Sequence, residues 1–111
     1  SLINETIKML LIRKPCEREL KELPSDVRED LADALARLEE GHHLSMPLSR
    51  PVPSFGKGIH ELRLRGSSGI YRVFYWLRGQ RDVVVLHAYK KTSQKLSLQA
   101  RELVIRRMQE R

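Results

Sequence analysis

Apolar residues recur in the second half of the chain as three strand-like runs, in which neighbouring positions fall on opposite faces. The runs are Ile59–Arg65, Ile70–Leu77 and Asp82–Tyr89. Gly66-Ser67-Ser68-Gly69 separates the first two, and Arg78-Gly79-Gln80-Arg81 separates the last two. Both spacers suit hairpin turns. The pattern therefore predicts three strands that pair as an antiparallel meander.

A helical spacing of apolar residues dominates the first half. Pro15 opens a short helical stretch, and Ser25 is the expected N-cap of a second helix that ends at Gly41. The tail after Ser97 is also helical by pattern. The apolar positions of the two N-terminal helices are Cys16, Leu20 and Leu23, then Val27, Leu31, Leu35 and Leu38.

Two segments complete the order of elements. Ile7–Ile12 is apolar and partly β-branched, which predicts a first strand, whereas the prolines and glycines of residues 44–58 predict a long loop. The order β-α-α-β-β-β-α predicts one α+β domain over residues 1–111, with both N-terminal helices on one face of a small, mainly antiparallel sheet. The residues expected in its core are Leu31, Leu35, Leu38, Leu62, Leu64, Val73, Val85 and Leu86.

Composition adds a strong positive charge to this picture. The formal net charge is +7 and the sequence pI is about 10.0. Residues 1–54 carry a balance of −2, residues 55–91 carry +6 and residues 92–111 carry +3. The positive charge is therefore concentrated in the predicted strands and the C-terminal tail. Such a field favours a polyanionic partner, with nucleic acid first, an acidic protein second and a membrane surface third.

Several classes of site are disfavoured. Cys16 is the only cysteine, so it forms no internal disulfide and no zinc cluster at the usual spacings, and we interpret it as a core residue. The basic region holds only Glu61 and Asp82 as acids, so we expect no metal and no cofactor. The apolar run Met9–Ile12 is too short to span a bilayer and no signal-peptide pattern precedes it. We expect a cytoplasmic protein without a membrane partner.

Basic side chains are expected to converge on one face of the meander. Glu61, Arg63 and Arg65 project from the same side of their strand, and Arg72 projects from the next strand. Lys90 and Lys91 end the last strand, beside His87 and Tyr89. Clustered Arg and Lys bind phosphates, and Arg does so through two parallel hydrogen bonds.

Such a face suits cleavage of RNA by its own 2′-hydroxyl. Cations stabilise the charge of the pentavalent phosphate, and a Lys or His with a shifted pKa can move protons. Tyr89, Tyr75 or Phe55 could stack on a base. The same residues have structural interpretations: His87 as a half-buried strand residue, and Tyr89 as a core or edge residue. The charge cluster alone indicates a domain that binds nucleic acid or an acidic partner.

Several short motifs occur in a fixed order along the chain: Leu23-Pro24-Ser25-Asp26-Val27-Arg28, Leu38-Glu39-Glu40-Gly41, Met46-Pro47-Leu48-Ser49, His60-Glu61-Leu62-Arg63-Leu64-Arg65, Gly69-Ile70-Tyr71-Arg72-Val73-Phe74-Tyr75 and Leu86-His87-Ala88-Tyr89-Lys90-Lys91-Thr92. Their order and spacing resemble the RelE/ParE toxin superfamily, in particular its phage-derived HigB-like branch. The resemblance implies a RelE-like fold and the toxin of a type II toxin–antitoxin pair. It implies a metal-independent endoribonuclease that cleaves mRNA on the ribosome, and a cognate antitoxin that is often a helix-turn-helix protein.

The resemblance also implies roles for single residues. Arg65 matches the family's phosphate-stabilising arginine, Arg72 matches the arginine of its Tyr-Arg-Val strand, and Lys91 matches a basic residue that acts on the scissile or leaving group. The C-terminal tyrosine of some RelE members has no counterpart after Tyr89, so Tyr89 or His87 is expected to replace it. The remaining RNA-binding candidates are Lys57, Arg63 and Lys90.

Two alternatives remain open within this superfamily. A ParE-type toxin shares the fold, has no enzymatic activity and inhibits DNA gyrase. An inactive prophage remnant would bind only its antitoxin. The density of basic residues on the meander favours the ribonuclease.

Overall fold

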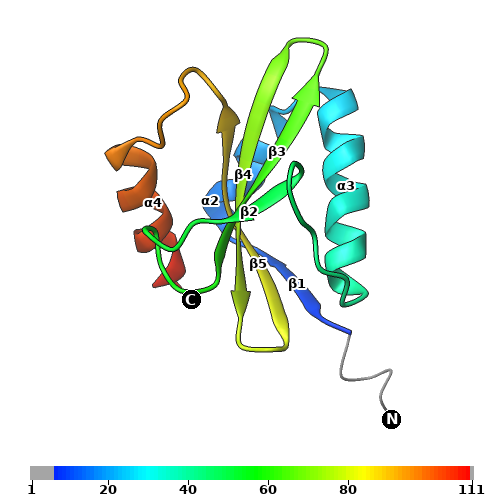
Figure 1. The fold of residues 1–111 in the computed structure, drawn as a ribbon, viewed down its shortest axis with the longest axis vertical. Coiled ribbons are helices and arrows are strands. Elements are labelled where there is room, and N and C mark those ends of the chain that lie inside the picture. Colours follow the sequence, from blue (N-terminus) through cyan, green and yellow to red (C-terminus); the bar gives the residue numbers. More distant parts are fainter. Residues whose placement is uncertain (1–6, 111) are drawn as a thin grey trace.

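The computed structural model describes residues 7–110. Its centre is a five-stranded mixed sheet in the order β1-β5-β4-β3-β2, shown in Figure 1. The strands are β1 (Met9–Ile12), β2 (Ser49–Pro51), β3 (Ile59–Gly66), β4 (Gly69–Arg78) and β5 (Asp82–Lys90). Strands β3, β4 and β5 form the predicted antiparallel meander, and β1 pairs with β5 in parallel.

Strand β2 corrects the expectation of a loop over residues 44–58. Ser49–Pro51 pairs antiparallel with β3, so that Ser49 lies opposite Leu62. The proline is tolerated because β2 is the outermost strand, and a missing N–H costs little at a sheet edge. The rest of the segment is irregular, as its glycines and prolines predict.

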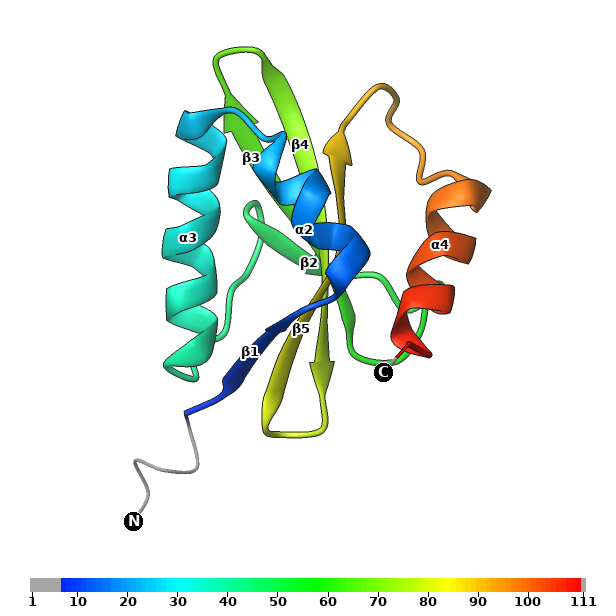
Figure 2. The same ribbon diagram turned by 180° about the vertical axis from the view of Figure 1, so that it is seen from behind.

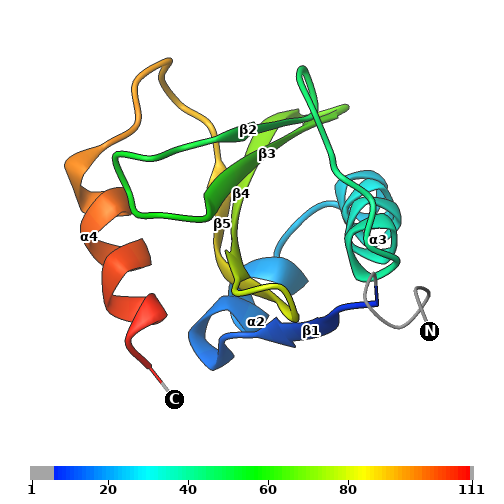
Figure 3. The same cartoon turned by 60° about the horizontal axis from the view of Figure 1, so that its bottom comes forward.

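Three helices cover the sheet: α2 (Lys14–Lys21), α3 (Ser25–Glu39) and α4 (Leu98–Met108). Helices α2 and α3 lie together on one face, and α4 lies on the other (Figures 2 and 3). The predicted α+β class and the placement of both N-terminal helices are confirmed. The expected cap of α3 is wrong: the N-cap position is Pro24, and no side chain caps the helix there.

Each face of the sheet has its own apolar core. Leu62, Val73 and Val85 pack under α2 and α3, whereas Phe74 and Leu86 pack under α4. All eight residues predicted to be buried are buried. Leu86 differs from the other seven because it belongs to the core beneath α4.

A β-bulge in β5 decides which residues reach the α4 face. Phe74 pairs with His87 and Tyr75 pairs with Val85, so Leu86 is an extra residue between the two pairs. Odd-numbered residues of β5 before the bulge face α2 and α3, as Val85 does. After the bulge the parity reverses, and Tyr89 packs on the α4 side. The bulge therefore reverses which residues at the end of β5 face α4.

Candidate functional site

Strands β3 and β4 and the residue that follows β5 contribute one residue each to a row at the end of the α4 face. Arg65 of β3 pairs with Ile70 of β4, and the backbone N–H of Lys91 donates to the Ile70 carbonyl at 2.7 Å. Neighbouring strands lie about 4.8 Å apart, which places the Cα atoms of Arg65 and Lys91 about 10 Å apart. Both long side chains can therefore reach an anion lying over Ile70.

A second row lies directly behind the first. Arg63, Arg72 and Tyr89 occupy paired positions of β3, β4 and β5. Arg63 and Tyr89 are partly exposed, whereas Arg72 is buried. The two rows bring together five of the residues that the sequence analysis predicts for this site.

The surface over these rows has two shallow hollows that meet at Ile70. The first has a volume of about 280 Å³ and the second about 450 Å³. The first is lined by Pro47, Leu48, Arg63, Arg65 and Ile70, and the second by Gly69, Ile70, Lys91, Thr92, Ser93 and Gln94. A chain of nucleotides with a phosphate over Ile70 would place one neighbouring group in each hollow.

The surrounding charges tune the ammonium of Lys91. Desolvation lowers the pKa of Lys91, and the nearby charges of Arg63, Arg72 and Arg65 lower it further, against the opposing effect of Glu61. Cations disfavour a further cation, so this ammonium releases its proton more readily than an isolated lysine does. A lowered pKa is the direction that makes an ammonium a better general acid.

Arg72 does not present its charge at the surface. Its Nε lies 2.7 Å from Oε2 of Glu61, and both side chains are 1% exposed. The second carboxylate oxygen of Glu61 accepts a hydrogen bond from Nε of Arg50 at 2.8 Å. Glu61 therefore neutralises a buried cation and also binds the partly exposed Arg50.

The other nitrogens of Arg72 bind the loop that follows β5. Nη2 donates to the Gln94 carbonyl at 2.9 Å, and Nη1 donates to the Lys95 carbonyl at 3.3 Å. Nη1 also lies 3.4 Å from the hydroxyl of Tyr89, which is a weak contact. Arg72, the catalytic candidate of the Tyr-Arg-Val strand, thus makes its contacts inside the protein.

The three aromatic candidates differ in accessibility. Tyr75 faces α2 and α3 and is buried, and Phe55 is buried against Phe74 with ring centroids 5.1 Å apart. Tyr89 is partly exposed, and its ring packs on Phe74 at 6.1 Å and on His87 at 4.9 Å. Of the three, only Tyr89 is partly exposed and belongs to the basic rows.

His87 lies in a different cluster. Its Nδ1 is 2.9 Å from Oε1 of Glu19, and the same oxygen accepts from Arg107 Nη1 at 2.8 Å and from the Ala88 N–H at 3.1 Å. His87 precedes Lys91 by four residues, or about 13 Å of strand. The structure therefore assigns His87 to a junction between α2, β5 and α4.

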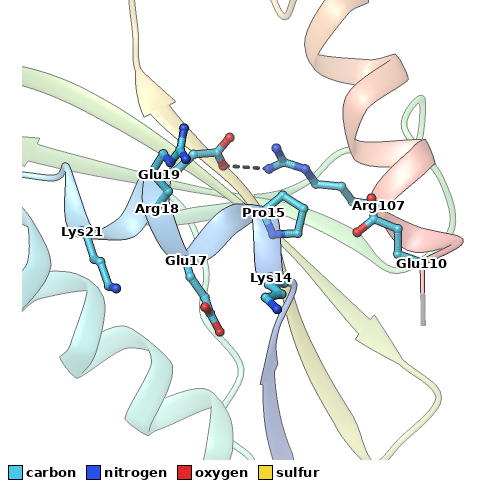
Figure 4. Close-up of a pocket in the computed structure, with 8 residues that line it drawn as sticks. All are labelled: Lys14, Pro15, Glu17, Arg18, Glu19, Lys21, Arg107 and Glu110. Atoms are coloured by element: carbon cyan, nitrogen blue, oxygen red, sulfur yellow. Dashed lines mark hydrogen bonds and ion pairs between the residues drawn. The ribbon is translucent and has the colours of Figure 1, made fainter.

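This junction borders a hollow of about 920 Å³ (Figure 4). Partial burial raises the pKa of Glu19, but hydrogen bonds from His87, Arg107 and Ala88 and the charge of His87 outweigh it and lower the value to about 2. The hollow's charged residues are Lys14, Glu17, Arg18, Glu19, Lys21, Arg107 and Glu110. The hollow therefore mixes cations and anions, unlike the exposed cations of the basic rows.

Two predicted RNA-binding residues lie away from the rows. Lys57 precedes the start of β3, and Ile59 to Arg65 spans about 20 Å of strand. Lys90 pairs with Tyr71, on the α2 and α3 face of the sheet. The expectation of one shared basic surface for both is corrected: Lys57 lies at the opposite end of the sheet, and Lys90 lies on the opposite face because the bulge reverses the parity of β5.

Sequence reasoning missed Arg50 and Gln94. Arg50 lies in a segment expected to be a loop, and Gln94 lies beyond the last predicted strand. In residues 7–110, no cluster of three or more His, Cys, Asp or Glu side chains is arranged to hold a metal ion. None of the helices described has the length and apolar composition that a membrane crossing requires.

Comparison with known proteins gives one family and one fold. The model of the family described as phage-derived protein Gp49-like (DUF891) matches residues 18–109. No curated protein matches the chain. A free-state structure of an arginine double mutant of the E. coli toxin RelE is 21% identical, with a TM-score of 0.66 over 92% of this chain and 98% of that one. The isolated E. coli RelE toxin in a P21 crystal form is 23% identical, with a TM-score of 0.55 over 89% and 97%. The chain therefore has the fold of RelE.

Proposed function

Because this chain belongs to the Gp49-like family of phage-derived proteins, we propose that it is the single-domain toxin of a type II toxin–antitoxin pair and that it cleaves mRNA on the ribosome. The observation that carries the proposal is the row of Arg65, Ile70 and Lys91 on the α4 face of the sheet. The chain that carries this row has the fold of RelE. Arg63 lies beside this row in the first hollow. Convergent cations with surface access suit a phosphodiester.

The reaction we propose is attack of a 2′-hydroxyl on the adjacent phosphate. The hydroxyl loses its proton to water, its oxygen bonds to phosphorus, and the bond to the 5′-oxygen breaks. Arg65 and Arg63 stabilise the charge of the pentavalent phosphate. The Lys91 ammonium donates a proton to the leaving 5′-oxygen. The products are a 2′,3′-cyclic phosphate and a 5′-hydroxyl.

Tyr89 supplies a stacking surface for a base at the second row, since its ring is partly exposed there. His87 takes no part in this scheme, because its Nδ1 is bound to Glu19 and about 13 Å of strand separates it from Lys91. The partner that we propose restrains the activity is an antitoxin, which is often a helix-turn-helix protein in the HigB-like branch that the sequence resembles. We propose that it covers Arg63, Arg65 and Lys91 with acidic groups, because complementary charges steer such encounters. The site of action is the cytoplasm, where ribosomes are.

The test is induced expression in a bacterial host, with primer extension on an abundant mRNA. We compare the wild type with Arg65→Ala, Lys91→Ala and the matched control Lys90→Ala. The control removes the same charge from the adjacent residue on the opposite face. We expect growth arrest with new in-frame mRNA ends in the wild type and the control. Each of the other variants should lower cleavage by about 10²-fold or more, as loss of one transition-state donor does.

The other outcomes identify the alternatives. Growth arrest with intact mRNA and induced DNA damage would indicate a ParE-type inhibitor of gyrase. The absence of arrest at full expression would indicate an inactive remnant that binds only its antitoxin. Loss of cleavage in Lys90→Ala together with full activity in Lys91→Ala would place the site on the opposite face and refute our assignment.

A further inference from the structure

The loop between β5 and α4 carries the proposed proton donor at its first position. The loop spans residues 91–97. Its last residue, Ser97, caps α4 because its side chain accepts a hydrogen bond from the Ala100 N–H. Residues 92–95 are exposed and lie outside the sheet. An exposed loop of this kind is mobile unless side chains fix its backbone.

Gln94 is the link between this loop and the ammonium of Lys91. Its side-chain Oε1 accepts a hydrogen bond from Lys91 Nζ at 3.1 Å. Its backbone carbonyl accepts from Arg72 Nη2 at 2.9 Å. The buried arginine therefore fixes the backbone of the residue that orients the ammonium.

The geometry of Arg72 suits this task better than contact with RNA. Its Nε faces Glu61, its Nη2 faces Gln94, and its Nη1 faces the Lys95 carbonyl. Nη1 and Nη2 donate hydrogen bonds, and Nε lies in an ion pair with Glu61 that lacks hydrogen-bond geometry, in a side chain that is 1% exposed. A phosphate contact would require Arg72 to leave Glu61, and a buried carboxylate without its cation is strongly unfavourable.

We propose that Arg72 is a positioning residue, which together with Glu61 holds residues 91–97 so that Gln94 directs the Lys91 ammonium toward the scissile phosphate. This inference rests on the proposed ribonuclease activity. It gives Arg72, which the resemblance matches to the arginine of the Tyr-Arg-Val strand, a role that acts through Lys91. It also explains why an acidic residue, Glu61, lies inside a basic site.

A double-mutant cycle tests the inference. Arg72→Lys keeps the charge, but one ammonium cannot replace a planar fork with three engaged nitrogens. We expect this variant to lower kcat by about 10-fold or more while KM changes by less than about 3-fold, because RNA contacts remain. In the Lys91→Ala background, Arg72→Lys should add less than about 3-fold, because the group that it positions is gone.

The matched control is Arg63→Lys, a change of the same chemistry at the residue paired with Arg72 across the strands. Arg63 contacts RNA in our scheme, so its effect should multiply with that of Lys91→Ala. Multiplicative effects for Arg72→Lys as well, together with a raised KM, would overturn the inference in favour of direct contact.

A second measurement is independent of activity. Backbone ¹⁵N relaxation on the full chain reports the order of residues 92–96. We expect order parameters of about 0.8 in the wild type and below about 0.6 in Arg72→Lys, with Arg63→Lys unchanged. If residues 92–96 stay ordered in a folded Arg72→Lys variant, the proposal that Arg72 holds this loop is refuted. If the wild type cleaves no RNA, the proposed function and the positioning of Lys91 for cleavage fail together, and relaxation still decides whether Arg72 holds the loop.

Discussion

Replacement of Glu19 by glutamine should remove a large part of the stability of this protein. Oε1 of Glu19 accepts hydrogen bonds from Arg107 at 2.8 Å, from His87 at 2.9 Å and from the Ala88 N–H at 3.1 Å. These donors belong to α4 and to β5, whereas Glu19 belongs to α2. Glu19→Gln keeps the size and one acceptor oxygen, so it tests the charge of the carboxylate.

The magnitude follows from the pKa of Glu19, which the folded protein lowers from 4.5 to about 2 against the effect of burial. At about 1.4 kcal/mol for each unit by which folded and unfolded values differ, the charge contributes about 3 kcal/mol to the free energy of unfolding. The pKa is lowered on folding, so this contribution is complete well above pH 4.5 and is lost as the pH falls toward 2. At pH 3 about 1.5 kcal/mol remains.

Urea denaturation followed by the fluorescence of Trp76, the single tryptophan, measures these free energies. We expect Glu19→Gln to be less stable than the wild type by about 3 kcal/mol at pH 7 and by about half of that at pH 3. Glu17→Gln, on the exposed side of the same helix, is the control and should differ little at either pH. A deficit of Glu19→Gln that is the same at both pH values would refute the reasoning, because the charge would then contribute nothing.

Three further predictions concern single residues. Burial raises the pKa of the Cys16 thiol to about 12, so iodoacetamide at pH 8 should label Cys16 only after unfolding, as mass spectrometry would show. A Cβ at Gly66 would lie 2.5 Å from Cγ2 of Val27, so Gly66→Ala should lower the melting temperature, and an unchanged melting curve would contradict this packing. Ser97→Ala removes the side-chain acceptor for the Ala100 N–H and should cost about 1 kcal/mol in urea denaturation, whereas Ser93→Ala in the same loop should cost less.

The sequence predicted the meander and the shared face of Arg63 and Arg65 because both depend on local patterns. Alternation along β3 and β4 assigns Arg65 and Ile70 to one face, and the short Ser67-Ser68 turn fixes their pairing. The buried core could be predicted in the same way, because apolar residues at strand or helix spacing form the buried side of their element. These parts of the fold were therefore predictable without any long-range contact.

The rest depends on partners that are distant in the sequence. Arg72 is buried because Glu61 faces it from β3, and the pattern of β4 alone cannot show that a cation has a counter-ion. His87 is bound by Glu19, which lies 68 residues earlier in the chain. The roles of these two residues could not be predicted because a local pattern carries no information about such contacts.

The extra residue Leu86 in β5 moves every later side chain of the strand to the opposite face of the sheet. Lys90 and Lys91 are chemically identical neighbours, and the bulge alone decides which of them joins Arg65. Removal of one residue at the bulge would exchange their faces without changing the composition of the site. An alignment of relatives that matches the lysines by residue type, and ignores a gap at position 86, would therefore assign the same function to two side chains that point in opposite directions.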